Sequence, residues 1–260
     1  MFVIIEGTKY YINSNELYIG FKQLKTMPSE IGKFINLEYL SLSHNQINTI
    51  PIEIGKLINL KELYLNDNQI NTIPSEIGKL INLIHVDLSY NQISKIPEEI
   101  GNLINLKELY LQNNQINTIP KEIGKLINLK EFYLHNNQIK TIPIEIGKLK
   151  NLKELYLSNN QIKTIPTEIG NSINLKKLYL LNNKIKTIPE EIGKIKKIMI
   201  IDESSYEIDN LDNDCKILIF SNLNENLINL PININKIYLQ KDINKELIKK
   251  IPYDCILESF

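Results

Sequence analysis

His85 and Asp87 are the two residues of this chain whose types and spacing come closest to a catalytic pair. An imidazole oriented by a carboxylate can act as a general base. However, residues two positions apart on a strand are always neighbours on one face. A catalytic pair would also need a nucleophilic side chain, and no column of such side chains accompanies these two residues. The other histidines, His44 and His135, lie too far along the chain to share a metal ion with His85. We therefore expect no catalytic residue and no metal site in this region.

Chemistry near the C-terminus would have to use Cys215, Cys255, Glu203 or Asp214, and no histidine lies in that segment. An enzyme built there would need to borrow a distant histidine to activate a thiol, so this hypothesis ranks last. Two cysteines are also few for a secreted repeat protein. We predict unpaired thiols in a reducing compartment, with a Cys215–Cys255 disulfide as the alternative.

The composition excludes several classes of partner. The formal net charge is zero, and all 30 basic residues are lysine, so the bidentate fork that reads phosphate or guanine is absent. The glycines recur singly and form no phosphate-binding loop, and no apolar run is long enough to span a membrane. We predict a cytoplasmic monomer with no cofactor, no nucleic-acid partner and no membrane partner. Abundant Ile, Asn and Lys indicate an AT-rich source, such as a protist or a large DNA virus.

A repeat of 23 residues is the strongest signal in the sequence. Proline recurs at this interval, and a glycine follows four residues after each proline. The prolines are Pro28, Pro51, Pro74, Pro97, Pro120, Pro143, Pro166 and Pro189, and the glycines are Gly32, Gly55, Gly78, Gly101, Gly124, Gly147, Gly170 and Gly193. Such a period predicts a stack of similar units, each too small to bury its apolar face alone.

Each unit has two halves, which the copy over 106–128 shows clearly. Residues 106–116 read Leu-x-x-Leu-x-Leu-x-x-Asn-x-Ile, with the alternation of a short strand, and 119–126 read Ile-Pro-x-x-Ile-Gly-x-Leu. This pattern resembles the leucine-rich-repeat family, and the second half is similar to the 23-residue class of Ras-binding and Scribble-type cytoplasmic scaffolds. Seven full copies begin at Leu37, Leu60, Leu83, Leu106, Leu129, Leu152 and Leu175, after a degenerate copy over 14–36.

The resemblance implies an α/β solenoid. We expect a right-handed superhelical arc with a parallel sheet on its concave side, irregular or helical segments on its convex side and a cap at each end. The predicted divisions are an N-terminal cap with the degenerate repeat (1–36), seven repeats (37–197) and an irregular C-terminal cap (198–260).

The two ends should cover the apolar core of the stack. Residues 1–13 are predicted to form a hairpin-like cap. Strands are expected over 216–220 and 236–239, followed by a helix that begins at Asp242.

An asparagine ends the strand half of every full copy. Its amide can satisfy turn amides and carbonyls that would otherwise be buried without a partner, so we assign this column a structural role. The column is Asn45, Asn68, Asn91, Asn114, Asn137, Asn160 and Asn183.

Outward-pointing strand residues should line the concave face in columns about 4.8 Å apart. The central column is Ser41, Tyr64, Asp87, Tyr110, Tyr133, Tyr156 and Tyr179, and beside it run Tyr39, Glu62, His85, Glu108, Glu131, Glu154 and Lys177. Lysines lie outside the acids, and on the other side is a column that contains His135. Tyrosine suits interfaces because it offers area and a hydroxyl at little entropic cost. The alternative is that duplication copied tyrosines that only stack on one another.

The predicted partner-binding residues are Tyr64, His85, Asp87, Tyr110, Tyr133, His135, Tyr156 and Tyr179. The third repeat departs most from the pattern, through Ile84, His85, Asp87 and Tyr90, which indicates either a specific contact or drift. On the convex side, a glutamate column with lysines three residues later should allow weak ion pairs.

Together these features predict a non-catalytic protein–protein interaction module that binds an unidentified protein on its concave face. The alternative is a substrate-recognition or regulatory subunit of a larger signalling or ubiquitin-ligase assembly, an analogy with other repeat proteins rather than an inference from residues.

Overall fold

The computed structural model describes most of the chain, including the hairpin, every repeat strand and eight short helices. The described residues are 1–180, 182–185, 189–194, 199–201, 217–220, 236–239 and 255–259.

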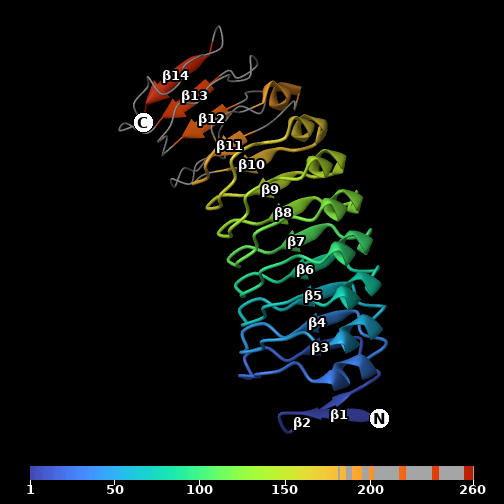
Figure 1. The fold of residues 1–260 in the computed structure, drawn as a ribbon. Coiled ribbons are helices and arrows are strands. Elements are labelled where there is room, and N and C mark those ends of the chain that lie inside the picture. The colour runs from blue at the N-terminus through green and yellow to red at the C-terminus, as the bar shows by residue number, and fades with distance from the viewer. Residues whose placement is uncertain are drawn as a thin grey trace.

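Twelve parallel strands, β3 to β14, form one sheet in strict sequence order. Those of the predicted repeats are Glu16–Tyr18 (β3), Tyr39–Ser41 (β4), Glu62–Tyr64 (β5), His85–Asp87 (β6), Glu108–Tyr110 (β7), Glu131–Tyr133 (β8), Glu154–Tyr156 (β9) and Lys177–Tyr179 (β10). Each strand pairs with the next at an offset of one whole repeat, so Leu40 lies beside Leu63 and Glu108 beside Glu131. Figure 1 shows the resulting ladder of strands running the length of the molecule.

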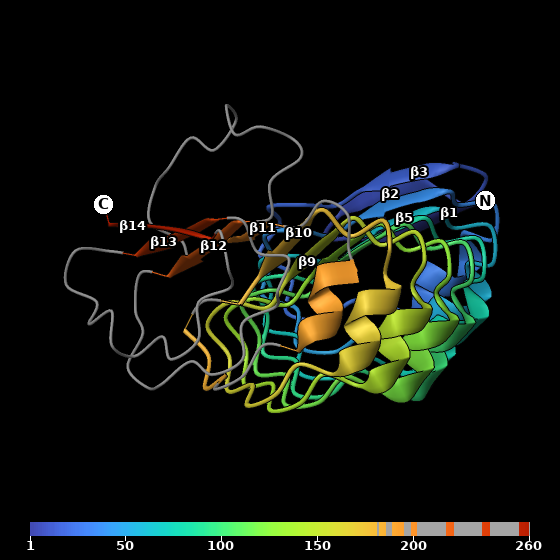
Figure 2. The same ribbon diagram turned by 90° about the horizontal axis from the view of Figure 1, so that it is seen from above.

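A five-residue 3-10 helix follows the proline of each repeat. These helices are Ser29–Lys33 (η1), Ile52–Lys56 (η2), Ser75–Lys79 (η3), Glu98–Asn102 (η4), Lys121–Lys125 (η5), Ile144–Lys148 (η6), Thr167–Asn171 (η7) and Glu190–Lys194 (η8). The proline ring restricts its own φ, as at Pro120 (−68°), and so prepares the chain to enter the helix. Tight i→i+3 turns suit a segment this short. Seen from above, the helices form one side of the coil and the sheet the other (Figure 2).

Leucine and isoleucine side chains from both sides meet in one continuous core. Within the copy over 106–128, Leu106, Leu109, Leu111, Ile123 and Leu126 are all fully buried. The sixth full repeat has Ser172 in the slot where the five full repeats before it have leucine. This serine is also fully buried, and its hydroxyl donates to the Ile146 carbonyl at 3.1 Å. A hydrogen bond therefore satisfies the polar atom that replaces the leucine side chain.

The repeat glycine allows neighbouring helices to approach closely. A Cβ placed on Gly124 would lie 2.8 Å from the Glu145 Cβ and 2.9 Å from the Glu145 carbonyl oxygen of the next repeat. These separations are too short for non-bonded atoms, so a side chain at this position would push the repeats apart.

Further strands lie outside the repeats, as a separate two-stranded hairpin near the N-terminus and as an extension of the parallel sheet near the C-terminus. Strands Phe2–Ile5 (β1) and Thr8–Tyr11 (β2) pair antiparallel, which confirms the predicted N-terminal hairpin. Three strands beyond the repeats are Ile217–Phe220 (β12), Lys236–Leu239 (β13) and Ile256–Ser259 (β14). The first two confirm the strands expected there, and β14 was not anticipated.

The strands Met199–Ile201 (β11) to β14 continue the parallel sheet of the repeats. The proposed division between repeats and cap at 197/198 stays a prediction, and the helix expected at Asp242 lies outside the described residues.

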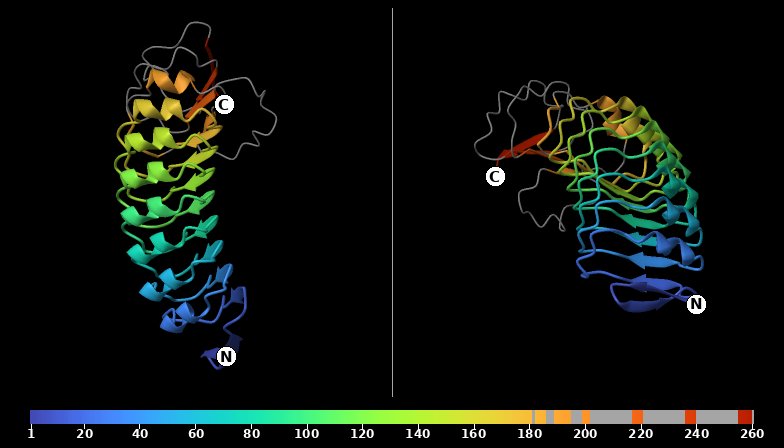
Figure 3. Two further views of the ribbon diagram at one scale, coloured as in Figure 1. Left: turned by 90° about the vertical axis from the view of Figure 1, so that its right-hand side faces the viewer. Right: turned by 60° about the horizontal axis from the view of Figure 1, so that its bottom comes forward.

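The predicted fold class is confirmed. The stack bends into an arc, with the sheet along the concave side and the 3-10 helices along the convex side (Figure 3).

Candidate partner-binding face

The asparagine column holds the turn that leaves each strand. The side-chain amide of Asn114 donates to the carbonyls of Leu88 and Leu111 at 3.0 and 3.1 Å, and its oxygen accepts from the Ile93 amide at 2.9 Å. Equivalent bonds recur for the other members of the column, from Asn45 to Asn183. Each asparagine therefore ties its own strand to the preceding repeat and gives partners to buried backbone groups.

The residue before each of these asparagines adopts a left-handed conformation. Asn113, Asn136 and Asn159 have φ of 57°, 56° and 55°. Asparagine tolerates this region better than most residues, and Asn136 also donates to the Asn113 side chain at 2.8 Å. Tyr90 occupies the same position in the third repeat with φ 53° and an exposed side chain. The unusual Tyr90 thus lies at the turn, away from the centre of the sheet.

Eight aromatic rings form an unbroken ladder across the concave face. In order they are Tyr18, Tyr39, Tyr64, His85, Tyr110, Tyr133, Tyr156 and Tyr179. Successive ring centroids lie 4.1 to 5.2 Å apart, the range of favourable aromatic contacts. The ladder spans β3 to β10, and each ring lies at a strand end next to at least one residue that is buried in the core.

The ladder uses two columns of the sheet. Where Ser41 and Asp87 interrupt the tyrosine column, rings from the adjacent column, Tyr39 and His85, fill the gap. Sequence analysis placed Tyr39 outside the site and did not include Tyr18. The signal that could have identified them is an aromatic residue in one of the two outward positions of every strand from β3 to β10.

His85 and Asp87, whose types and spacing come closest to a catalytic pair, have different hydrogen-bond partners. The Nδ1 atom of His85 lies 2.8 Å from Glu108 on the next strand, while Asp87 accepts from the Ser89 amide and hydroxyl at 2.9 and 2.6 Å. Asp87 is therefore occupied by its own turn. His135 lies beside the ladder, with its ring 6.4 Å from Tyr133 and 6.2 Å from Tyr156.

Carboxylates of the neighbouring column accept hydrogen bonds from the ladder hydroxyls. Tyr64 donates to Glu62 at 2.9 Å, and Tyr110 donates to Glu131 at 2.8 Å. Tyr133 and Tyr156 both donate to Glu154, at 3.2 and 3.0 Å. These hydrogen bonds hold the phenols in fixed orientations before any partner arrives.

Several ladder tyrosines lose their hydroxyl protons less readily than a free tyrosine, because their pKa values are raised. Burial is the main cause that raises the pKa of Tyr64, Tyr110 and Tyr156 above its ordinary value, and neighbouring charges add to it. The pKa of Tyr133 is raised mainly by burial as well. A phenolate here would lose hydration and face the glutamate column, so the neutral form is favoured.

A second asparagine ladder, which sequence analysis missed, runs along the edge where the strands begin. The side chain of Asn105 donates to the Ile81 carbonyl at 2.9 Å, and the same bond recurs in the adjacent repeats. With Lys61 and Lys107, these asparagines line a groove of about 450 Å³. The lysine column therefore lies at this edge, to one side of the ladder. The recurrent Ile-Asn-Leu before each strand was the available signal.

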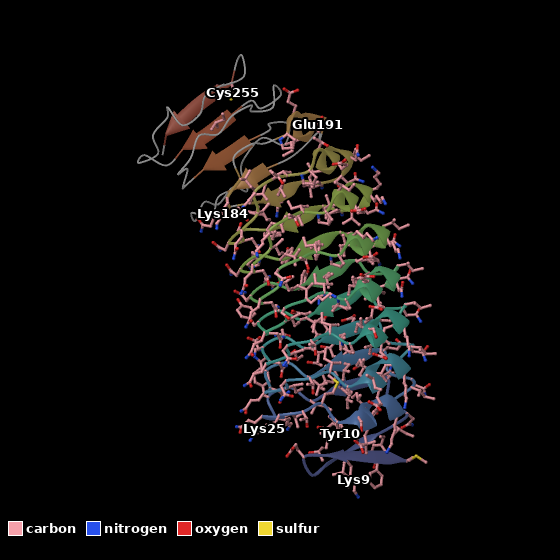
Figure 4. All side chains as sticks on the ribbon, in the orientation of Figure 1. Lys9, Tyr10, Lys25, Lys184, Glu191 and Cys255 are labelled. Carbon is pink, nitrogen blue, oxygen red and sulfur yellow. The ribbon has the colours of Figure 1, made fainter. Side chains whose placement is uncertain are left out.

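The spacing of glutamate and lysine in the 3-10 helices allows weak ion pairs on the convex side. Among the described side chains of η1 to η7, no glutamate pairs with a lysine of the same helix. Instead, the Glu53 and Lys56 side chains both pack towards Gly32 of the preceding repeat. Figure 4 shows side chains projecting along the whole coil, with the labelled Glu191 on η8 and Lys184 at the opposite, turn edge.

Four residues near the C-terminus were considered as catalytic candidates. Three of them, Glu203, Asp214 and Cys215, lie outside the described residues. Cys255 is a partly buried free thiol just before β14, and burial raises its pKa. Within the described ranges, no cluster of three or more His, Cys, Asp or Glu side chains could hold a metal ion. No helix of those ranges has the length and apolar character needed to cross a membrane.

A parallel sheet with a 23-residue repeat, backed by one short helix per turn, defines a solenoid repeat protein. The chain belongs to the leucine-rich-repeat family: the family model described as leucine-rich repeat region matches residues 21–110, 76–158 and 97–245. No curated protein matches the chain.

Solved structures show the same fold. A plant peptide hormone receptor, RGFR1 in complex with RGF2, is 32% identical with a TM-score of 0.70, over 83% of this chain and 38% of the receptor. The leucine-rich-repeat ectodomain of the Arabidopsis thaliana membrane receptor kinase GASSHO1/SCHENGEN3, in complex with Casparian strip integrity factor 2, is 23% identical with a TM-score of 0.66. It aligns over 94% of this chain and 38% of its own length. This chain thus spans well under half of either structure.

Proposed function

We propose that the protein is a non-catalytic binding module that holds another protein against the aromatic ladder on its concave face. The observation that carries this proposal is the continuity of the eight rings across two sheet columns. If the rings only stacked on one another, tyrosines in a single column would be enough. Here Tyr39 and His85 provide a ring on the two strands where that column has no tyrosine. The likeness to a peptide hormone receptor in complex with RGF2 supports the same class of function.

The physical properties of the face favour binding. The ladder rings from Tyr64 to Tyr156 are partly exposed, and each rests on a fully buried core. Stacking and hydrogen bonds to glutamates restrict their rotamers in advance, so less entropy is lost when a partner binds. Rigid, partly exposed tyrosines are typical of residues that dominate binding energy.

The test is affinity capture from cell lysate with a ladder variant and a matched control. The ladder variant is Tyr110→Ser/Tyr133→Ser/Tyr156→Ser. The control variant, Lys121→Ser/Ile144→Ser/Thr167→Ser, changes exposed positions on η5, η6 and η7 and leaves the ladder intact. Circular dichroism first establishes that both variants fold.

We expect wild type and the control variant to capture the same protein and the ladder variant to lose it. Capture by all three would remove the ladder from the binding site, and capture by none would contradict the proposed function. A Tyr→Leu version of the ladder variant removes the rings, keeps apolar side chains at these positions, and serves if the serine variant does not fold.

We further propose that the protein acts as a monomer in a reducing compartment, the cytoplasm, because the free thiol of Cys255 is compatible with reducing conditions. Thiol titration of unfolded protein from non-reducing preparations should give two reactive thiols per chain. A value of zero would establish a disulfide and overturn this placement.

A further inference from the structure

The hydrogen bonds of the ladder determine what the concave face still offers to a partner. A phenol has a single O–H donor, and those of Tyr64, Tyr110, Tyr133 and Tyr156 are already directed at glutamates. A carboxylate has room for several donors and retains acceptor capacity after accepting one or two. The face therefore presents apolar ring surface and unused acceptors, and has few donors of its own.

The charge of the glutamate row is only partly neutralised. Glu154 is paired with Lys177 at 3.2 Å, whereas Glu108 is hydrogen-bonded to the His85 imidazole at 2.8 Å. Between them, Glu131 accepts a hydrogen bond from Tyr110 and has no ion-pair partner among the described residues. Glu108, Glu131 and Glu154 lie side by side in register on β7, β8 and β9, so three carboxylates share one short stretch of the face.

The lysines that lie outside the glutamate row do not remove this excess of negative charge. Lys61 is paired with Glu38 and, like Lys107, lines the groove at the edge where the strands begin. Along each strand segment the order is lysine, glutamate and then the ring, as in Lys130, Glu131 and Tyr133. The carboxylates are therefore the charged column adjacent to the rings, and Coulomb energy falls with distance.

We propose, on the basis of the proposed function, that the partner presents an extended basic segment to this face. Its lysine or arginine side chains lay their aliphatic stems against the ladder rings and place their cationic heads in the carboxylate row centred on Glu131. Long basic side chains commonly combine these two contacts, because the stem is apolar and the head needs acceptors. Charged hydrogen bonds from such heads are stronger than neutral ones.

The geometry also sets the length and spacing of the segment. Strands are about 4.8 Å apart, so the ladder from β3 to β10 spans about 34 Å, or about ten residues of extended chain. In the polyproline II form of an extended chain, three residues complete one turn and rise about 9.3 Å, close to two strand spacings of about 9.6 Å. Every third side chain then points to the same side, so basic side chains at this interval meet the face at every second strand.

Three synthetic peptides test the proposal with the full-length chain. Each has twelve residues, with Lys, Glu or Gln at every third position and Gly or Ser elsewhere, and carries a fluorophore for anisotropy titration at low salt. We expect the Lys peptide to bind at least about tenfold more tightly than the Glu peptide, with the Gln peptide between them. Equal affinities, or no binding of the Lys peptide at about 1 mM, would overturn the proposal.

Two glutamine variants locate the charge that is responsible. Glu131→Gln keeps an oxygen for the Tyr110 hydroxyl and removes the charge, whereas Glu122→Gln removes the same charge from η5 on the convex side. We expect Glu131→Gln to weaken Lys-peptide binding roughly threefold to fivefold and Glu122→Gln to leave it unchanged. Equal weakening by the two variants would mean a diffuse attraction and would contradict a site at Glu131.

These outcomes are distinguishable from failure of the proposed function. If peptide charge has no effect while the Tyr110/Tyr133/Tyr156 serine variant still loses its captured protein, the concave site stands and its preference for basic segments is wrong. If that variant keeps the captured protein, the concave site itself is wrong.

Discussion

The imidazole of His85 lies 5.0 Å from the ring of Tyr110 in an edge-to-face arrangement, with an interplanar angle of 84°. On its other side it lies 4.6 Å from Tyr64. This one side chain therefore joins the two halves of the aromatic ladder across the position where Asp87 replaces a tyrosine.

Replacing His85 separates the effect of the ring from that of its nitrogen atoms. We expect His85→Ala to lower the free energy of unfolding by about 1–2 kcal/mol, because it removes two ring contacts and the partner of Glu108. His85→Phe keeps the contacts and removes the buried Nε2 atom, which has no hydrogen-bond partner, so its cost should be smaller. Urea denaturation measures both, and equal losses would show that the ring contacts contribute nothing.

The two asparagine ladders should differ sharply in their contribution to stability. Asn114→Ala leaves two carbonyls and the Ile93 amide without a side-chain partner in a buried turn, and we expect a loss of about 2–4 kcal/mol. Asn105→Ala removes one exposed bond that water can replace, so the loss should stay below about 1 kcal/mol. Chemical denaturation of the two variants provides the comparison, and similar losses would contradict this division of roles.

The repeat period made the columns of the concave face predictable. Because every strand pairs with the next at an offset of one repeat, residues 23 apart, such as Glu108 and Glu131, must lie side by side. Burial of the alternate leucines then determines which residues point outward. The fold class and the strands β12 and β13 followed from the same pattern of alternation and spacing.

The partners of individual side chains could not be predicted in this way. Residues two apart on a strand are separated by about 6.6 Å, whereas neighbouring strands are only about 4.8 Å apart. His85 therefore meets Glu108 across the strands more readily than Asp87 along its own strand. The ring of Tyr39 likewise contacts the ring of Tyr64 in the adjacent column. This contact depends on how far the side chains reach, which the repeat pattern does not determine.

The close approach of helices at the repeat glycines can be tested by adding a single methyl group. We expect Gly124→Ala to lower the free energy of unfolding by about 1–3 kcal/mol, since the new Cβ would meet both the Cβ and the carbonyl oxygen of Glu145. Gly20→Ala is the control, because its Cβ would meet only the Ser43 carbonyl oxygen at 3.1 Å and its cost should be less than about 1 kcal/mol. Thermal unfolding of both variants gives the result, and equal stability of Gly124→Ala and wild type would show that the helices can move apart freely.

The raised pKa of the ladder tyrosines predicts a loss of stability in alkali. Below about pH 10 the hydroxyls are protonated in both the folded and the unfolded chain, so they contribute no pH dependence. Above about pH 10 the unfolded chain releases these protons while the folded chain keeps them, and stability falls as pH rises.

We expect the melting temperature to decline between pH 9 and pH 11.5, and the decline to be shallower in Tyr110→Phe/Tyr133→Phe/Tyr156→Phe, whose rings cannot ionise. Lysine titration affects both proteins alike, so the difference between their curves isolates the tyrosines. Absorbance at 295 nm should show Tyr110, Tyr133 and Tyr156 of folded wild type ionising at higher pH than tyrosines of the unfolded chain. Parallel curves for the two proteins would mean that the ladder hydroxyls ionise as readily in the folded chain as in the unfolded one.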